Sequence, residues 1–201
     1  MSQVSSPGAE LRALPVGSYV RIADLRHGSP TAKRSALSHA VRSGDLVRLH
    51  AGLYFKGERT RFGMTRPRLE DIAFAVLGTS GTGPAEYSAA RYLGLTTQVP
   101  KAVHVATVGH TPDSLVKGVE VHTRRNRARL NLNRSEIAVL EVLRDPGNFV
   151  ERGWTSLVDA VRSRVSDGDV RVEPLRAAAD SEHSRATHTN AGRLFADMGV
   201  A

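Results

Sequence analysis

The chain has 201 residues, 40% of them hydrophobic, and carries a formal net charge of +8 at pH 7 with no cysteine. This length suffices for one large domain or two small ones, whereas the absence of cysteine excludes disulfides, thiolate zinc sites and cysteine nucleophiles. No apolar run reaches the roughly 18 residues that a membrane-spanning helix needs, and the first residues lack the pattern of a secretory signal. We therefore expect a cytoplasmic protein.

The positive charge is concentrated in the first third of the chain. Residues 1–66 hold 11 lysines and arginines against 4 acidic residues, a net charge of +7. Residues 67–201 hold 17 against 16, a net charge of +1. Solubility alone would not segregate charge in this way, so the basic segment predicts a polyanionic partner.

The first predicted elements are two helical segments, a longer helix and a hairpin. A short helix is expected over residues 8–14, and residues 18–25 are typical of a strand that runs into a helical turn. The longer helix is predicted over residues 30–43, with Ser29 as N-cap and proline at its first position. Residues 47–56 alternate apolar and polar side chains on both sides of an Ala-Gly turn, which predicts a two-stranded hairpin.

The longer predicted helix has one narrow apolar stripe and an opposite face that is polar and basic. The apolar residues recur at helical spacing; they are Ala32, Ala36, Leu37, Ala40 and Val41. The opposite face carries Thr31, Lys33, Arg34, Ser35, Ser38, His39 and Arg42. Small residues among the cations would let this face approach the edges of DNA bases.

A helix followed directly by a basic hairpin, with two short helical segments before it, has the element order of a winged helix-turn-helix. In that arrangement the helix enters the major groove and the hairpin contacts the flanking backbone. The seven polar residues of the helix face are therefore candidate DNA-binding residues, and Arg48, His50 and Lys56 of the hairpin are expected to contact phosphates. On this interpretation Arg34→Ala should reduce operator preference, whereas Lys56→Ala should weaken binding to all DNA.

The rest of the chain predicts a mixed domain. Residues 57–67 lack periodicity and carry three arginines, so we interpret them as a linker between domains at residues 1–60 and 66–201. Helices are expected in segments 68–78, 84–95, 133–145, 153–165 and, in two pieces, 173–200; strands are expected in segments 101–109 and 118–125. The predicted fold class is α/β (α+β), an N-terminal winged helix-turn-helix with a C-terminal mixed α/β domain.

Three segments carry a resemblance to a known family. They read "LPVGSYVRIADL", "SALSHAVRSGDLVRLHAGLYFKG" and "YSAARYLGLTTQVPKAVHVAT". Together they resemble the AbiEi family of antitoxins from bacterial type IV (abortive infection) toxin–antitoxin systems. The positions that match the family's pattern are Pro15, Gly17, Ala36, Leu37, Gly52, Leu53, Tyr54, Phe55, Ala89, Ala90, Leu93, Gly94, Leu95, Gln98 and Pro100. The resemblance covers roughly residues 11–145 and is strongest in the hairpin and in "LGLTTQVP".

The resemblance implies two activities. The winged helix would repress the antitoxin–toxin operon, an autoregulation, by binding inverted repeats in its promoter DNA. The C-terminal domain would counteract a nucleotidyltransferase-like toxin, directly or indirectly. A dimer on the DNA is expected because one small winged helix makes too few contacts for high specificity. We expect a transcriptional repressor with no enzymatic activity, no cofactor and no metal.

The arginine-rich run at residues 123–134 is a candidate second basic surface. It places Arg124, Arg125, Arg127 and Arg129 near a predicted strand-to-helix loop. These residues would contact nucleic acid or the toxin, although a solvated loop accounts for them equally well.

Other chemical motifs are weak. The segment "GTSGTGP" at residues 78–84 lacks the Gly-Lys-Ser/Thr ending of a nucleotide loop and is interpreted as a flexible connection. His183 and His188 are five residues apart, which is poor spacing for one helical face, and no third metal ligand is evident. Glu70 and Asp71 are neighbours at a helix start, where side chains diverge, so they do not predict a catalytic pair.

Two alternative functions remain open on the sequence alone. One is a winged-helix regulator whose C-terminal domain senses a small molecule and which has no toxin partner. The other is an enzyme that acts on nucleic acid, which would need a cluster of carboxylates or histidines that the sequence pattern does not assemble from residues 67–201.

Overall fold

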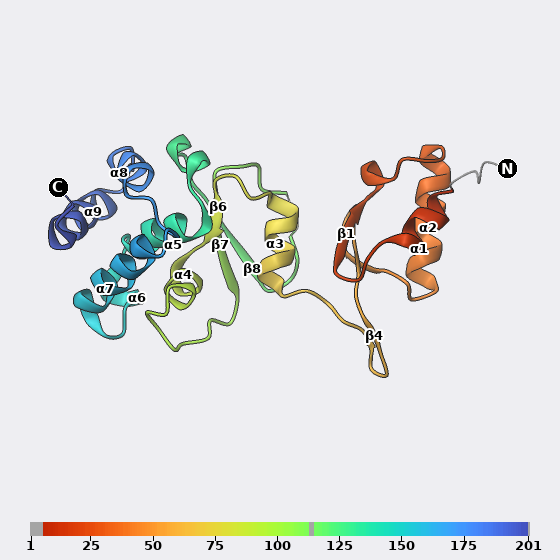
Figure 1. Ribbon diagram of the computed structural model, residues 1–201, viewed down its shortest axis with the longest axis horizontal. Coiled ribbons are helices and arrows are strands. Elements are labelled where there is room, and N and C mark those ends of the chain that lie inside the picture. The colour runs from red at the N-terminus through yellow and green to blue at the C-terminus, as the bar shows by residue number, and fades with distance from the viewer. Residues whose placement is uncertain (1–5, 113–114, 201) are drawn as a thin grey trace. The chain divides into compact units, whose positions relative to one another are not determined.

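The computed structural model describes residues 6–112 and 115–200. The chain divides between Ile72 and Ala73 into two compact units (Figure 1). Each unit has its own hydrophobic core. The first unit contains α1 (Pro7–Ala13), β1 (Ser18–Arg21), the 3-10 turn η1 (Ile22–Asp24), α2 (Pro30–Arg42), β2 (Val47–His50), β3 (Leu53–Lys56), β4 (Arg59–Thr60) and β5 (Gly63–Met64). The elements predicted up to residue 56 are confirmed to within about a residue at each end.

Helix α2 begins where its sequence predicts. The Ser29 hydroxyl accepts a hydrogen bond from the Ala32 N–H at 3.2 Å, and Pro30 occupies the first turn. A proline there loses no hydrogen bond, because the first helical N–H groups have no partner within the helix. The predicted N-cap is therefore confirmed, and it fixes the start of the basic face.

The first unit has a three-stranded antiparallel sheet in the order β1-β3-β2. Its core joins the helices to the sheet and consists of Leu11, Val20, Leu25, Leu37, Ala40 and Leu46. Leu37 of α2 is 1% exposed, so this helix is anchored by its apolar stripe and turns its opposite face outward. The hairpin has an irregularity in β2 between Arg48 and His50, where the pairing shifts by one residue.

The segment interpreted as a linker has structure of its own. Strands β4 and β5 pair as a short antiparallel hairpin, with Arg59 opposite Met64. The sequence pattern missed it because strands of two residues are too short to show periodicity.

The second unit is a small sheet covered by helices. Its elements are α3 (Leu69–Leu77, which crosses the boundary between the units), β6 (Thr82–Pro84), α4 (Glu86–Tyr92), β7 (Val103–Thr107), β8 (Val119–Thr123), η2 (Arg127–Asn131), α5 (Arg134–Val142), α6 (Pro146–Phe149), α7 (Gly153–Ser166), α8 (Val172–Asp180) and α9 (Arg185–Met198). The predicted capping box of α5 is confirmed, since Asn133 and Glu136 accept each other's backbone N–H.

Strand β7 lies at the centre of this sheet, antiparallel to β6 and parallel to β8. Its two faces are covered by different helices (Figure 1). Val105 packs against Phe74 of α3, whereas Ala106 belongs to the large core with Ala89 of α4 and Ile137 of α5. The side chains of β7 that share a face with Ala106 therefore lie toward α4.

The predicted mixed α/β class is confirmed by this combination of helices and sheets. The interpretation of residues 78–84 as a flexible connection is wrong, because Thr82–Pro84 form the buried strand β6. The Thr82 hydroxyl is hydrogen-bonded to the Thr107 hydroxyl at 2.8 Å, so these two buried polar groups each have a partner. Among the described residues, no helix has both the length and the apolar character needed to cross a bilayer.

Gly83 allows β6 and α5 to approach each other closely. A Cβ at this position would lie 2.7 Å from the Ile137 side chain. We expect Gly83→Ala to lower the free energy of unfolding by about 1–3 kcal/mol, because overpacking displaces the helix or the strand. Urea denaturation measures the change. Gly192→Ala on α9 is the control, since a Cβ there meets nothing within 4 Å and should leave stability equal or higher.

Candidate nucleic-acid interface

Five of the predicted DNA-binding residues share one solvent-exposed face of α2. They are Thr31, Arg34, Ser35, Ser38 and Arg42, and all are exposed. Thr31 is followed at a distance of three and four residues by Arg34 and Ser35, and Ser38 and Arg42 continue at the same spacing, which places the five residues on a common face. This face presents two guanidinium groups on either side of small hydroxyl side chains, a composition suited to close contact with base edges and phosphates.

Two other predicted residues of α2 lie elsewhere. The Lys33 ammonium group donates a hydrogen bond to the Leu25 carbonyl, and its side chain is half-buried. Lys33 therefore ties α2 to the preceding loop, which corrects its assignment to the DNA-binding face. His39 is exposed but lines a cleft beside Leu11 and Arg12 of α1, on another side of the helix.

Lys56 at the end of the hairpin is also engaged inside the unit. Its Nζ donates to the carbonyls of Leu11 at 3.2 Å and Arg12 at 2.7 Å. These carbonyls lie in the last turn of α1, where helical acceptors lack partners and the dipole favours a cation. The predicted phosphate contact of Lys56 is therefore replaced by a structural role.

Lys56→Met should accordingly reduce stability and leave the salt dependence of DNA binding unchanged. Loss of hydrogen bonds from a charged donor should lower the free energy of unfolding of the first unit by about 1.5–3 kcal/mol. Urea unfolding followed by circular dichroism tests the first part. A flatter salt slope for DNA binding in the variant would instead restore the phosphate contact.

Of the three hairpin residues predicted to contact phosphates, one is exposed. Arg48 is exposed on β2, and its Nε donates to the His50 carbonyl at 3.4 Å. The His50 side chain is half-buried. Arg48 is thus better placed than His50 to contact the phosphate backbone of DNA.

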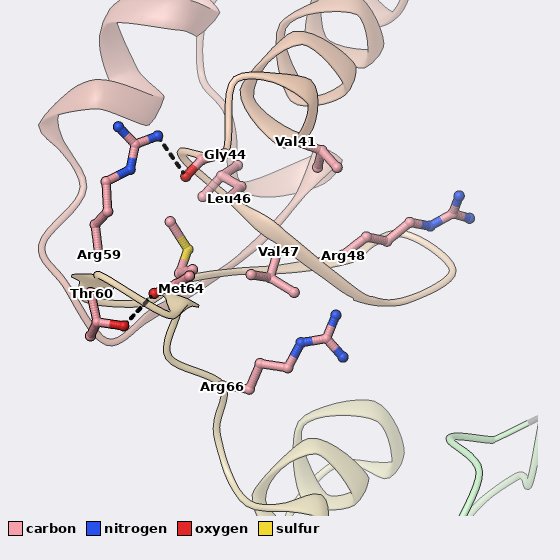
Figure 2. Close-up of a pocket in the computed structure, with 10 residues that line it drawn as sticks. Val41, Gly44, Leu46, Val47, Arg48, Arg59, Thr60, Met64 and Arg66 are labelled. Atoms are coloured by element: carbon pink, nitrogen blue, oxygen red, sulfur yellow. Dashed lines mark hydrogen bonds between the residues drawn. The ribbon is translucent and has the colours of Figure 1, made fainter.

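Arg48 also lines a cleft of about 580 Å³ between the end of α2, β2 and the β4–β5 hairpin (Figure 2). Arg59 and Arg66 line the same cleft. Arg59 holds the end of α2, since its guanidinium donates to the carbonyls of Ser43 at 2.8 Å and Gly44 at 3.2 Å. Arg48 and Arg66 are exposed, which makes the cleft a candidate phosphate site that sequence analysis missed. The available signal was the three arginines within residues 57–67.

The tip of the β4–β5 hairpin carries an exposed aromatic ring. Phe62 is 86% exposed, and the Arg61 guanidinium lies 4.6 Å from the centre of its ring. An apolar ring and a cation at a hairpin tip are the groups that proteins use to contact stacked bases and backbone together.

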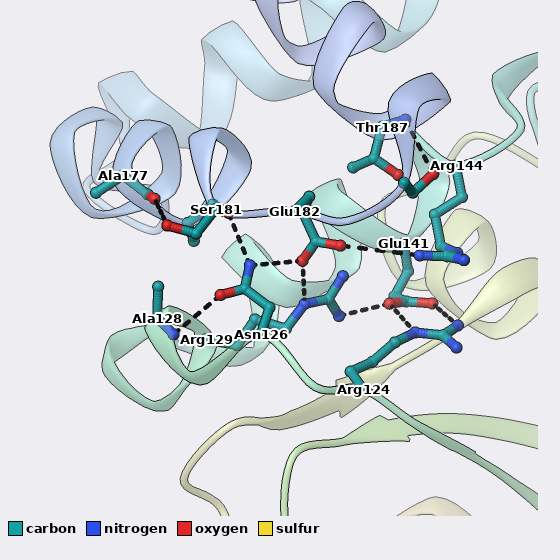
Figure 3. Close-up of polar contacts among 12 residues, drawn as sticks. Arg124, Asn126, Ala128, Arg129, Glu141, Arg144, Ala177, Ser181, Glu182 and Thr187 are labelled. Atoms are coloured by element: carbon teal, nitrogen blue, oxygen red, sulfur yellow. Dashed lines mark hydrogen bonds and ion pairs between the residues drawn. The ribbon is translucent and has the colours of Figure 1, made fainter.

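The predicted second basic surface is wrong for two of its four arginines. Arg129 is fully buried, and Arg124 has 17% of its side chain exposed. Arg125 and Arg127 are exposed. The buried pair point inward because acidic partners from other elements surround them (Figure 3).

These partners form a buried ionic network in the second unit. Arg124 binds Glu141 of α5 through two hydrogen bonds of 2.9 and 2.6 Å, and Arg129 bridges Glu141 at 2.5 Å and Glu182 at 2.6 Å. Asn126 donates to Glu182 and to the Ala178 carbonyl, both at 2.8 Å. The network therefore links η2, α5 and the segment between α8 and α9, and its arginines are structural.

The network controls the ionisation of Glu141. Burial by itself would raise the pKa of this carboxyl, but its hydrogen bonds and ion pairs with Arg124 and Arg129 outweigh burial and lower the pKa. Glu141 is therefore charged at neutral pH.

Comparisons with known proteins bear on the fold. No family model and no curated protein matches the chain. A solved structure that is similar is the crystal structure of the RV2827C protein from Mycobacterium tuberculosis, with a TM-score of 0.53 and 19% sequence identity. The similarity covers 96% of this chain and 75% of that chain. At this identity the chain shares a fold with that protein, a mixed architecture of helices and small sheets.

Proposed function

We propose that the first unit is a winged helix-turn-helix that binds double-stranded DNA. The observation that carries this proposal is the outward face of α2, where Arg34 and Arg42 flank exposed hydroxyl side chains. Helix α2 would lie in the major groove. The β2–β3 hairpin would contact the flanking phosphates through Arg48.

The topology of the first unit supports the proposal. Two short helical segments precede α2, and the hairpin follows it after a turn of a few residues. The sheet order β1-β3-β2 places the first strand beside the hairpin, so that all three strands form one platform beside the core. A basic face on a rigid, well-anchored helix suits sequence reading better than a basic loop would.

We further propose that the protein is a cytoplasmic antitoxin of a type IV toxin–antitoxin system. The support is the resemblance of residues 11–145 to the AbiEi family, in which an N-terminal DNA-binding domain precedes a C-terminal antitoxic domain. On this proposal the chain represses its own operon from inverted repeats, as a dimer or as paired monomers. Its second unit counteracts a nucleotidyltransferase-like toxin.

The DNA-binding proposal is tested with the DNA immediately upstream of the chain's own gene. Fluorescence anisotropy is measured for this DNA and for a scrambled duplex of the same composition, each at two salt concentrations. We expect tenfold or greater preference, about 1.4 kcal/mol, that persists at the higher salt. Weak binding that is equal for the two duplexes and disappears at the higher salt would mean that the basic face attracts polyanions without recognising sequence.

The antitoxin proposal needs a separate test. The full chain is expressed together with the product of the neighbouring gene, and bacterial growth is compared with expression of that product alone. Rescue of growth is the expected result. Sequence-specific DNA binding without rescue, together with a small molecule that co-purifies, would favour a ligand-sensing regulator instead.

A further inference from the structure

Three side chains that can bind a metal converge in the second unit from three elements. Glu86 is the first residue of α4, His104 lies on β7 and His122 lies on β8. In the parallel pairing, His104 stands opposite Glu120, two residues before His122, so the side chains of His104 and His122 lie on the same face of the sheet. It is the face that α4 covers, which brings Glu86 to the two imidazoles.

One ligand atom from each of the three residues lies within 4.8 Å of the other two. Nδ1 of His104 lies 3.1 Å from Nε2 of His122 and 3.2 Å from Oε2 of Glu86. Nε2 of His122 lies 3.5 Å from Oε1 of Glu86. A tetrahedral zinc ion with bonds of roughly 2.0–2.1 Å separates its ligand atoms by roughly 3.3–3.4 Å. The three measured separations, two of them to different oxygens of the Glu86 carboxylate, are therefore close to those between the ligands of one zinc ion.

Hydrogen bonds alone account poorly for this arrangement. A ring nitrogen of histidine carries either one hydrogen or one lone pair. Nδ1 of His104 nevertheless faces three partners, because Oε2 of Glu120 lies 3.7 Å away in addition to His122 and Glu86. One hydrogen can be shared well with only one of them. A cation at the centre would interact with the two imidazole lone pairs and the carboxylate at once.

We propose that Glu86, His104 and His122 bind a divalent transition-metal ion, with Zn²⁺ the ion that fits the donor set. Two imidazoles and one carboxylate are zinc ligands, whereas Mg²⁺ and Ca²⁺ prefer oxygen ligands throughout. The side chains of His104, His122 and Glu86 are 14%, 23% and 35% exposed, so an ion can enter from solvent. A water molecule or Glu120 would complete the coordination. The proposal is independent of DNA binding.

The surroundings of the site support a fixed geometry. Glu86 has a φ of 48°, and it is the single non-glycine residue with positive φ among the described residues. Such conformations are rare for L-residues and cluster at functional sites. The His104 backbone N–H donates to the Ser88 hydroxyl of α4 at 3.0 Å, which holds strand and helix together. The neighbouring cation Arg124 is paired with Glu141 through two hydrogen bonds.

The proposal is tested on the full chain after removal of metal with a chelator. Zn²⁺ is titrated against a chromophoric competitor, with Mg²⁺ in parallel. We expect one equivalent of Zn²⁺ to bind and Mg²⁺ to give no signal. His122→Gln and Glu86→Gln should each weaken Zn²⁺ binding by about 100-fold or more, since loss of outer-sphere partners alone costs roughly 10–100-fold. His188→Gln is the control, because His188 is exposed on α9 and is not one of the three proposed ligands.

A second measurement needs no variant. Imidazole nitrogen resonances of the wild-type protein are followed by NMR during the Zn²⁺ titration, and those of His104 and His122 should shift together.

Circular dichroism establishes that each variant is folded before its affinity is compared. Stoichiometric binding that shifts only other histidines would overturn the proposal, as would the absence of binding or equal affinity in His122→Gln and His188→Gln.

Discussion

Glu141→Gln is expected to lower the free energy of unfolding of the second unit by about 3–5 kcal/mol, the usual cost of removing one partner from a buried ion pair. Glu141 is fully buried and is the shared partner of Arg124 and Arg129. Glutamine keeps the size of the side chain but removes the negative charge between two guanidinium groups. Arg129, which is also fully buried, would then depend on Glu182 alone.

Urea unfolding of the full chain, followed by circular dichroism, measures this loss. Asp159→Asn is the matched control, because Asp159 pairs with Arg162 on the surface of α7, where its side chain is 63% exposed. Exposed pairs of this kind contribute roughly 0–1 kcal/mol. Equal small losses in both variants would mean that water reaches the network and that its charges are not isolated as the structure indicates.

The same network should make the second unit sensitive to acid. The pKa of Glu141 is lowered in the folded state, because its bonds to Arg124 and Arg129 outweigh the effect of burial. A lowered folded pKa contributes stability that is present above the unfolded pKa of about 4.3 and is lost as pH falls through the folded pKa. Melting temperatures between pH 7 and pH 3 should therefore fall more steeply below pH 4 for the wild type than for Glu141→Gln. Parallel curves would assign the acid sensitivity to other carboxyls.

Features that depend on neighbouring residues in the chain could be predicted from the sequence. The start of α2 follows from Ser29 and Pro30, and the start of α5 follows from the capping box of Asn133 and Glu136. The hairpin follows from period-two alternation around Gly52. In each case one local preference dominates, so no distant contact was needed to decide the structure.

The hydrogen-bond and ion-pair partners of the long cationic side chains could not be predicted in this way. Lys33 and Lys56 occupy polar positions in their patterns, yet each donates to backbone carbonyls of another segment. Arg129 belongs to a basic run, yet it is buried against Glu141 and Glu182, which lie 12 and 53 residues further along the chain. A pattern shows which side chains are charged but not which acceptors the fold brings to them.

The proposed metal site was missed for a related reason. Glu86 and His104 are 18 residues apart in the chain, as are His104 and His122, far beyond the spacing of a local metal motif. His183 and His188 are the histidines that stand close together in the sequence, yet they do not lie with these three residues. Only the parallel pairing of β7 with β8, and the position of α4 over that face, bring the three ligands together.

Arg34→Ala is the most direct test of whether the exposed face of α2 recognises DNA sequence. If Arg34 contacts a base edge, the variant should lose about 1–3 kcal/mol of affinity for the upstream DNA and much less for scrambled DNA. Arg48→Ala should weaken binding to both duplexes similarly and flatten the salt slope by about one unit, because a phosphate contact carries no sequence information. Anisotropy titrations at two salt concentrations give both quantities.

Arg127→Ala supplies the control for net charge. Arg127 is exposed but lies in the second unit, outside the proposed interface, so its loss should change neither the preference nor the salt slope beyond a small general effect. Equal losses on operator and scrambled DNA in Arg34→Ala would remove this residue from the reading role. Losses in Arg127→Ala as large as those in Arg48→Ala would move the DNA-binding surface toward η2. The contrast between the three arginines thus separates sequence reading, phosphate contact and overall charge, which the excess of basic residues in the first third of the chain cannot distinguish by itself.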